Sequence, residues 1–217
     1  MNLLAETIGW IASIFVLFMF VPQLVKMLKL KTGLGVSLGT WTLNIALSLA
    51  WLVFGIKESI AQTIVLNILL VPLIVAVLYI TLKENHSPKK YFPLILAGLT
   101  ALTIAMFTLP AQTIGILCII LCVSADLPQV LKSVKSYRTH ATTAVSLSTW
   151  NLAIIGGMLW LFYGLLTGTT AIAVANLFTL GTRSFIITCE TLNKRRATLP
   201  ITETVVVKTS VLQPQES

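Results

Sequence analysis

The sequence predicts an all-α integral membrane protein in which seven transmembrane helices form two parallel three-helix repeats joined by a linker helix (3+1+3). Three observations predict this fold class. First, the 217-residue chain is 56% hydrophobic and only 10% charged, whereas soluble domains carry about 25% charged residues. Second, the apolar residues form seven runs, each near the ~20 residues that a helix needs to cross a bilayer. Third, a set of polar and aromatic motifs occurs twice. The composition excludes a disordered chain, a coiled coil, a disulfide scaffold and an ordinary soluble enzyme.

The seven apolar segments set the expected order of elements. The first lacks a basic N-terminal region and is too long for a signal peptide, so it is taken as a membrane span. We expect spans at residues 4–28, 36–56, 59–82, 91–109, 111–133, 144–166 and 169–192. These spans divide the chain into four parts. They are a first repeat at 1–83, a cytoplasmic loop and linker helix at 84–109, a second repeat at 110–192 and a disordered cytoplasmic tail at 193–217.

Lysine and arginine occupy alternate connections between these spans. Thirteen of the fifteen basic residues lie after the first, third, fifth and seventh spans, while the connection after the second span holds only Lys57. Basic residues favour the cytoplasmic side. We therefore expect the N-terminus outside and the C-terminus in the cytoplasm. The expected location is the plasma membrane, which the distribution of basic residues does not itself indicate. The net charge of +8 does not gather on one amphipathic face with aromatic residues, so no nucleic-acid partner is expected.

An internal repeat relates the first and last three spans. Pro22-Gln23 near the end of the first span matches Pro128-Gln129 near the end of the fifth. VSLGTW at the start of the second span matches VSLSTW at the start of the sixth, and LAWLVFG matches MLWLFYG further along the same two spans. Each repeat has three helices, and its basic loop lies on the same side of the membrane. The fourth span must therefore cross the membrane to restore direction, which makes the two repeats parallel.

These motifs resemble the PQ-loop superfamily, and most closely the SWEET and SemiSWEET sugar transporters. The evidence is the ordered set of PQ, S-L-x-T-W, W-x-x-[FY]-G and Asn, which occurs twice. The resemblance implies facilitated transport of sugars by alternating access. It also implies that Trp51, Asn67, Trp160 and Asn176 line the substrate pocket. Unlike the second helix of each repeat in many eukaryotic SWEETs, the second and sixth spans contain no proline.

The resemblance further implies that the two PQ motifs act in gating. Pro22 and Pro128 would let the first helix of each repeat bend, and Gln23 and Gln129 would support that helix where its backbone bonding is interrupted. A proline inside a helix removes one backbone hydrogen bond and kinks the helix. A paired hinge and a static kink are both open interpretations of these positions.

Helix arithmetic brings the Trp and Asn residues of each repeat to similar depth. With a rise of ~1.5 Å per residue, Trp51 lies ~8 Å and Asn67 ~12 Å below the outer ends of their spans. An indole face stacks on the apolar face of a sugar, and an amide offers a donor and an acceptor. The alternative is a Trp in an interfacial belt and an Asn that joins helices. For Trp41 and Trp150, near the inner ends of their spans, belt or packing roles are favoured.

Asp126 and Arg183 are ionisable residues inside predicted spans, where such residues usually face a cavity or a partner. Both lie ~21–22 Å from the outer ends of their spans, so we expect an ion pair near the inner gate. Phe20 and Ile74 hold the matching places in the first repeat. A static structural pair, Arg183 reaching to the inner interface, and proton coupling through Asp126 are the alternatives.

A sugar uniporter is the leading functional prediction. A proton-coupled amino-acid carrier of the PQ-loop type is the second, and a seven-helix receptor or sorting protein is a third from another class. The expected partners are a small-molecule sugar and the lipid bilayer, and assembly into a homo-oligomer is left open. Cys118, Cys122 and Cys189 have no further ligands nearby in the sequence, so no metal site is expected. No nucleophile–base set and no phosphate-binding loop is recognised either, so no enzymatic activity is expected, and no cofactor is expected.

Overall fold

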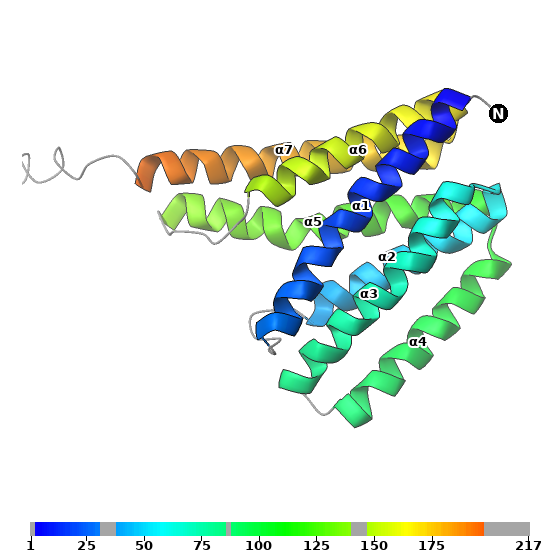
Figure 1. Ribbon diagram of the computed structural model, residues 1–217, viewed down its shortest axis with the longest axis horizontal. Helices are drawn as coiled ribbons and strands as arrows, with labels where there is room; N and C mark the ends of the chain where they lie inside the picture. The colour runs from blue at the N-terminus through cyan, green and yellow to red at the C-terminus, as the bar shows by residue number, and fades with distance from the viewer. Residues whose placement is uncertain (1–2, 31–37, 86–87, 140–146, 198–217) are drawn as a thin grey trace, which may run out of the picture.

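The computed structural model describes residues 3–30, 38–85, 88–139 and 147–197, which form seven α-helices. In chain order these are α1 (Leu3–Leu30), α2 (Leu38–Glu58), α3 (Ala61–Asn85), α4 (Pro88–Thr108), α5 (Ala111–Thr139), α6 (Leu147–Thr167) and α7 (Thr170–Ala197) (Figure 1). Each helix contains a stretch long and apolar enough to cross a membrane. The chain is therefore an integral, multi-pass membrane protein, as the sequence predicts.

The helix starts agree with the predicted spans to within a few residues, but two helices run further at their C-terminal ends. Helix α5 continues to Thr139 and α7 to Ala197, beyond the predicted limits of 133 and 192. Hydropathy marks where a helix leaves the apolar layer, whereas the backbone hydrogen bonds continue into the polar region. The prediction of a disordered tail from 193 is therefore wrong for residues 193–197, while residues 198–217 lie outside the described residues.

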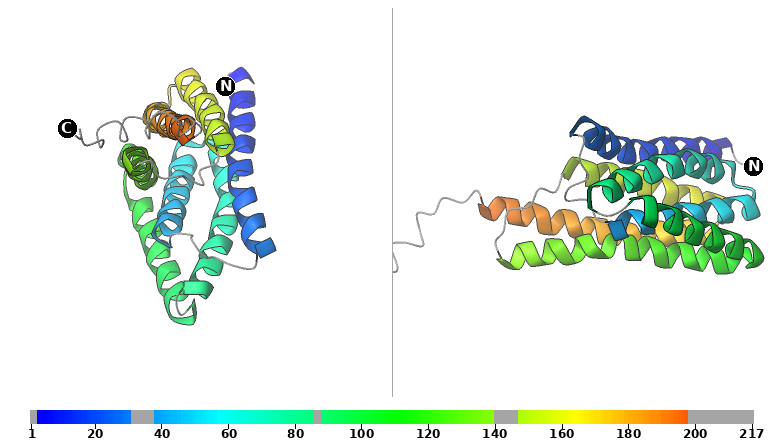
Figure 2. Two further views of the ribbon diagram at one scale, coloured as in Figure 1. Left: turned by 90° about the vertical axis from the view of Figure 1, so that its left-hand side faces the viewer. Right: turned by 90° about the horizontal axis from the view of Figure 1, so that it is seen from below.

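Six helices form a ring, and the linker helix lies outside it. Within the first repeat α3 packs between α1 and α2, and within the second α7 packs between α5 and α6. Across the repeats α1 packs against α6, and α2 against α5, so the two three-helix units are related by an approximate twofold arrangement. Helix α4 packs only on α2 and α3 among the main contacts and lies at the edge of the bundle (Figures 1 and 2).

The backbone of the turns repeats as well. Ser59, between α2 and α3, has a φ of 56°, and Gly168, between α6 and α7, has a φ of 71°. The two residues are 109 positions apart, which is the offset that relates the later motifs of the two repeats. Both turns thus use one residue in the left-handed region to reverse the chain. The observed fold is the predicted 3+1+3 arrangement.

The two repeats pack closely at one end of the ring. We call this the Leu3 end, because α1 begins there, and the opposite end the Leu30 end. At the Leu3 end a Cβ added to Gly9 would lie 2.8 Å from the ring of Tyr163. A Cβ added to Gly115, the equivalent residue, would lie 2.8 Å from the Cβ of Ala171 and 3.2 Å from the ring of Phe54. Only glycine permits this approach, and the helices converge here and diverge toward the Leu30 end (Figure 1).

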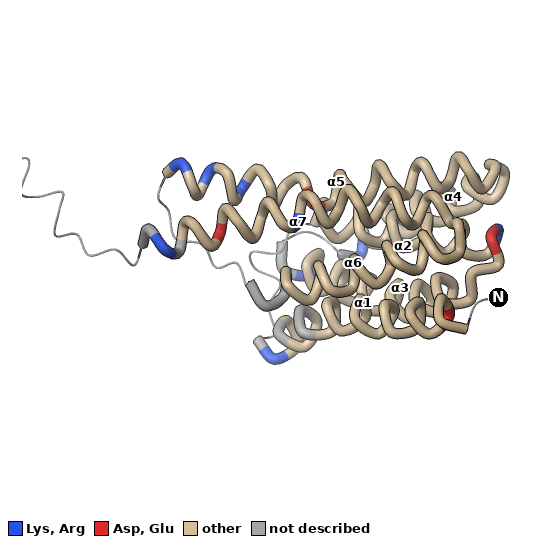
Figure 3. Tube along the Cα trace, turned by 90° about the horizontal axis from the view of Figure 1, so that it is seen from above, with Lys and Arg blue, Asp and Glu red and all other residues tan. Residues whose placement is uncertain are grey.

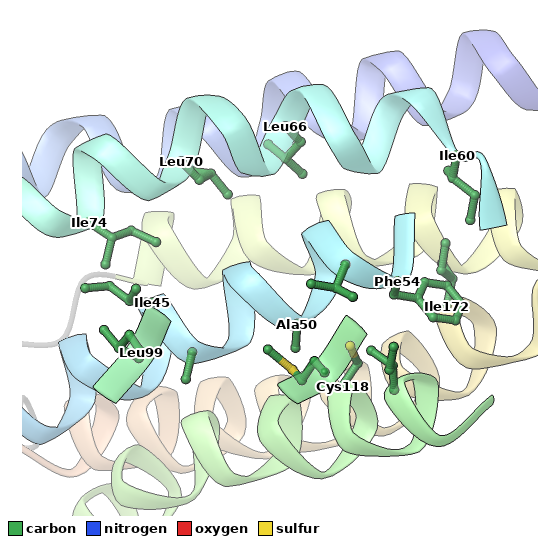
Figure 4. Close-up of a cluster of buried hydrophobic side chains, with 14 of the residues drawn as sticks. Ile45, Ala50, Phe54, Ile60, Leu66, Leu70, Ile74, Leu99, Cys118 and Ile172 are labelled. Carbon is green, nitrogen blue, oxygen red and sulfur yellow. The ribbon is translucent and has the colours of Figure 1, made fainter. Parts of the chain in front are cut away.

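An apolar core joins the helices of the first repeat to α5. Buried side chains of α2 and α3, such as Ala50, Phe54 and Leu66, pack toward Cys118 of α5 (Figure 4). Large apolar side chains are also exposed along the outside of the bundle, for example Phe18, which is 62% exposed. An exterior of this kind suits contact with lipid rather than water.

The charged residues separate the two ends. Most of the lysines and arginines of the described helices lie at the Leu30 end, while Glu6, Lys57 and Glu58 lie at the Leu3 end (Figure 3). The three-dimensional placement thus reproduces the alternation seen along the sequence.

Candidate functional site

A cavity of about 400 Å³ lies inside the ring and receives side chains from all six of its helices. Its lining includes early residues of α2 and α6, such as Thr40 and Trp150, but not the glycine and aromatic residues that join the repeats at the Leu3 end. The cavity therefore extends from the middle of the bundle toward the Leu30 end and is closed at the Leu3 end. Its volume falls in the range of small-molecule sites, roughly 300–1,000 Å³.

The four residues of the predicted substrate pocket all line this cavity. Trp51 and Asn67 come from α2 and α3 of the first repeat, and Trp160 and Asn176 from α6 and α7 of the second. They reach one space because the second and third helices of each repeat run antiparallel through the same depth. The structure thus brings together, between the repeats, residues that are far apart in the sequence.

Each indole is held by the aromatic residue of its own W-x-x-[FY]-G motif. The ring centroids of Trp51 and Phe54 lie 5.5 Å apart and those of Trp160 and Tyr163 lie 5.3 Å apart, both edge-on. Residues three apart on a helix share a face, which is why the motif spacing produces this contact. The indoles are therefore fixed in orientation by the same residues that close the Leu3 end.

The two asparagines differ in their hydrogen bonds. Asn67 is 4% exposed; its amide nitrogen donates to the Thr63 carbonyl at 2.8 Å, and its oxygen accepts from the Ser48 hydroxyl at 2.7 Å. Asn176 is half-buried, and its nitrogen donates to the Ile172 carbonyl at 2.9 Å.

In the described part of the chain no donor reaches the Asn176 side-chain oxygen, because Gly157 stands where the first repeat has Ser48. The Asn176 oxygen is therefore available to a ligand, whereas that of Asn67 is occupied.

Asp126 and Arg183 form an ion pair on the wall of the same cavity. The Arg183 Nε lies 3.2 Å from Oδ2 of Asp126, and the same oxygen accepts a hydrogen bond from the Thr182 hydroxyl at 3.0 Å. The Arg183 Nη1 donates to the carbonyl of Ala153 on α6 at 3.1 Å. The charged pair therefore joins α5, α6 and α7. Its two side chains contact one another and also line the cavity.

The opposite wall of the cavity is apolar at the matching positions. Phe20 and Ile74 of the first repeat also line the cavity, and Phe20 packs edge-on against Trp41 with ring centroids 6.0 Å apart. A bound molecule would meet charge on the side of the second repeat and apolar surface on the side of the first.

The second PQ motif leads from the cavity into a buried polar chain. Gln129 lines the cavity, and its amide nitrogen donates to Ser133 at 3.1 Å; the Ser133 hydroxyl donates to Glu190 of α7 at 2.6 Å. Gln129 thus bonds a side chain one turn further along its own helix, α5. Pro128 lies inside α5. Pro22 and Gln23 lie within α1, and their side chains are outside the described residues.

Three residues in or near the candidate site do not follow from the sequence. The depth of Trp150 favours packing or an interfacial belt, yet it lines the cavity, which reaches further toward the Leu30 end than the Trp–Asn pairs suggest. Glu190 is only 1% exposed, and its position inside the predicted seventh span is the signal that could have found it. Ser48 carries no signal of its own, because single hydroxyls are common in membrane helices.

Comparisons with known proteins agree with this geometry. The family model for the PQ loop repeat matches residues 4–63 and again residues 110–172, which are the first two helices of each unit and the start of the third. No curated protein sequence matches the chain. The fold is similar to that of a eukaryotic SWEET transporter solved at 3.7 Å resolution, with 14% sequence identity and a TM-score of 0.71 over 88% of this chain and 95% of that one.

The family match and the shared fold agree with the predicted PQ-loop family and with the predicted seven-helix arrangement. Two matched segments that together cover more than half of the sequence, in two helical units of the same build, establish that the chain belongs to the PQ-loop repeat family.

Proposed function

We propose that this protein moves small neutral sugars across the plasma membrane by alternating access, as a facilitative uniporter. The observation that carries the proposal is the meeting of two equivalent Trp–Asn pairs in one cavity between the repeats. Transporters built from parallel repeats bind their substrates at the repeat interface near mid-membrane. The likeness of the fold to that of a eukaryotic SWEET transporter also supports it.

The lining chemistry suits an uncharged polyol. Trp51 and Trp160 offer flat apolar faces to a sugar ring, with N–H donors at their edges. The side-chain oxygen of Asn176 can accept a hydrogen bond from a sugar hydroxyl. Asn67 is bonded to Ser48 and so holds α2 and α3 together on the first-repeat side of the cavity. Three indoles line the cavity with this pair of amides, so most of a ring sugar's surface could be covered without a net charge on the ligand.

The packing of the two ends supports alternating access. The glycine–aromatic contacts hold the Leu3 end closed, while the cavity extends toward the Leu30 end. With basic residues on the cytoplasmic side, the Leu3 end is extracellular and this arrangement is the inward-facing one. Bending at Pro22 and Pro128 would then close the Leu30 end as the Leu3 end opens. We propose residues 1–83 and 110–192 as the two moving repeats and 84–109 as their linker.

The test is uptake into proteoliposomes that contain the purified full-length protein. Labelled D-glucose, D-fructose, sucrose and a set of L-amino acids are compared with and without a pH gradient. We expect saturable sugar uptake that equilibrates and is unchanged by the gradient. Amino-acid uptake that requires the gradient, with no sugar uptake, would refute the proposal.

The ion pair supports a second candidate, a proton-coupled amino-acid carrier. Asp126 and Arg183 line the cavity, and a carboxylate and a guanidinium are the groups that would bind an ammonium and a carboxylate. Asp126 would also be the group that takes up a proton. The sugar proposal is preferred because the two charges already neutralise one another through a contact of 3.2 Å, whereas the paired indoles have no evident role for a small amino acid.

A further inference from the structure

We infer that Asp126 and Arg183 form a substrate subsite that binds two adjacent hydroxyl groups of the sugar. The inference rests on the proposed function and extends it, because it assigns the charged pair a direct contact with the substrate. It also predicts how the sugar is oriented, with its hydroxyl edge toward the second repeat.

The ion pair uses only part of each side chain. Its Nε–Oδ2 contact is single rather than bidentate, and Oδ2 also accepts from Thr182. On the arginine, Nε and Nη1 are occupied, the latter by the Ala153 carbonyl. In the part of the chain that the structure describes, Oδ1 of Asp126 and Nη2 of Arg183 make no hydrogen bond to the protein.

These two atoms are open rather than sealed in the protein interior. Among the described residues, only the Thr63 hydroxyl is a fully buried side-chain polar atom without a partner. Oδ1 and Nη2 therefore retain access to open space, and both side chains line the cavity. A carboxylate oxygen and a guanidinium nitrogen of one ion pair, neither bonded to the protein, thus belong to residues on the same wall of the cavity.

An acceptor next to a donor matches adjacent hydroxyls on a sugar ring. Each hydroxyl can both donate and accept, so one can donate to Oδ1 while its neighbour accepts from Nη2. Hydrogen bonds to ionised groups are about twice as strong as neutral ones. The pair carries no net charge, so a neutral ligand leaves no charge uncompensated in the membrane interior.

The surroundings hold the pair in position for this contact. Thr182 and the Ala153 carbonyl fix the two side chains from α7 and α6. A Cβ added to Gly157 would lie 3.7 Å from Nη1, so the guanidinium lies directly against α6. The apolar Phe20 and Ile74 on the opposite wall would face the other side of the sugar.

The experiment measures binding to the full-length protein by tryptophan fluorescence, with D-glucose and its 2-, 3-, 4- and 6-deoxy analogues as probes. For the wild type, we expect two analogues that lack hydroxyls on neighbouring carbons to bind roughly tenfold to a hundredfold more weakly than D-glucose. This is the range for the loss of a hydrogen bond to a charged group. Asp126→Asn should bind D-glucose more weakly and lose most of that discrimination. Thr188→Ala, on the exposed face of α7, is the matched control and should behave as the wild type.

A charge-swapped variant, Asp126→Arg with Arg183→Asp, separates substrate contact from structural support. We expect it to recover a monodisperse, thermally stable protein but not the wild-type pattern of deoxy-sugar affinities. Recovery of that pattern, or equal loss for every analogue in Asp126→Asn, would overturn the subsite while leaving sugar transport intact. If the wild type neither binds nor transports any sugar, the proposed function itself fails.

Discussion

The two asparagines of the cavity occupy equivalent positions but have different neighbours. Asn67 is buried and accepts a hydrogen bond from Ser48 at 2.7 Å. In the second repeat Gly157 stands at the position equivalent to Ser48, and among the described residues no donor reaches the Asn176 side-chain oxygen. Removing one partner of a buried hydrogen bond leaves a group unsatisfied and costs about 1–3 kcal/mol. The same substitution should therefore have different consequences in the two repeats.

We expect Asn67→Ala to lower the Tm of the detergent-purified protein and reduce sugar uptake, because the Ser48 hydroxyl loses its acceptor. Asn176→Ala should reduce uptake while the Tm stays near that of the wild type. The measurement is thermal unfolding of each variant paired with proteoliposome uptake. Equal Tm losses for the two variants would mean that both amides are structural and that Asn176 does not contact substrate.

The indoles give a second residue-scale prediction. Trp51→Ala and Trp160→Ala should each weaken sugar binding by about tenfold or more, equivalent to ~1.4 kcal/mol, because each removes one stacking face. Trp10 is 40% exposed on α1 and does not line the cavity, so Trp10→Ala is the matched control. Binding isotherms that are unchanged in the cavity variants would assign Trp51 and Trp160 to packing alone.

The sequence predicts these residues unevenly, for physical reasons. Trp51, Asn67, Trp160 and Asn176 are distinctive residues that recur at one offset, and helix rise alone brings each pair to a common depth. Trp150 escapes prediction because depth along a helix does not reveal how far a cavity extends. Contacts such as Ser48 with Asn67 depend on the rotation of two helices about their axes, which hydropathy does not specify.

Helices α5 and α7 are joined by polar contacts on both sides of Pro128. Asp126 pairs with Arg183 on one side, and Gln129 bonds Ser133, which bonds Glu190, on the other. A bend at Pro128 would therefore carry α7 with α5. The equivalent positions in the first repeat hold Phe20, Ile74, Met27 and Thr81, so its helices lack these charged connections.

If Pro22 and Pro128 act as hinges, replacing them should lower the maximal rate of sugar uptake more than the affinity for sugar. We expect Pro22→Ala and Pro128→Ala to fold, to bind sugar with nearly wild-type affinity and to show a reduced maximal uptake rate, because the straightened helix closes the Leu30 end less readily. Pro93→Ala in the linker helix is the control. Normal maximal rates in both PQ variants would indicate that the kinks are static.

At the scale of elements, the sequence predicts the seven helices and their order well. Apolar runs of span length have few alternatives in a bilayer, since every backbone group must bond within the helix. The ends are less predictable, because α5 and α7 continue as helices through polar residues. The order within each unit, with α3 between α1 and α2, could not be deduced from periodicity, because each span is apolar around most of its circumference.

The molecule as a whole has one end rich in lysine and arginine and one end where Lys57 is accompanied by Glu6 and Glu58, which predicts its orientation in the membrane. Glu58→Cys at the Leu3 end should react with an impermeant maleimide in intact cells, and Lys89→Cys at the Leu30 end only after permeabilisation. The native cysteines are first replaced by Ala or Ser, so that only the introduced cysteine can react. Small residues are chosen because Cys118 and Cys189 are buried and Cys122 is partly buried. The reverse labelling pattern would contradict the predicted topology.

The asymmetry between repeats extends across the whole molecule. The second-repeat wall of the cavity carries the Asp126–Arg183 ion pair and the hydrogen-bonded chain from Gln129 through Ser133 to Glu190. The first-repeat wall has apolar residues at the positions matching the ion pair, and its asparagine is hydrogen-bonded to Ser48. The two repeats share the backbone of their turns, their glycine–aromatic contacts and their Trp–Asn pairs. The differences between the copies are where substrate selectivity would be determined.

Counterflow tests the central claim most directly, because only a carrier with one central site exposed alternately to each side produces it. Proteoliposomes loaded with unlabelled D-glucose are diluted into labelled D-glucose without a pH gradient. We predict a transient accumulation of label above equilibrium for the wild type, and none for the Trp51→Ala/Trp160→Ala protein. Simple equilibration without overshoot in the wild type, or no sugar movement at all, would contradict an alternating-access sugar carrier.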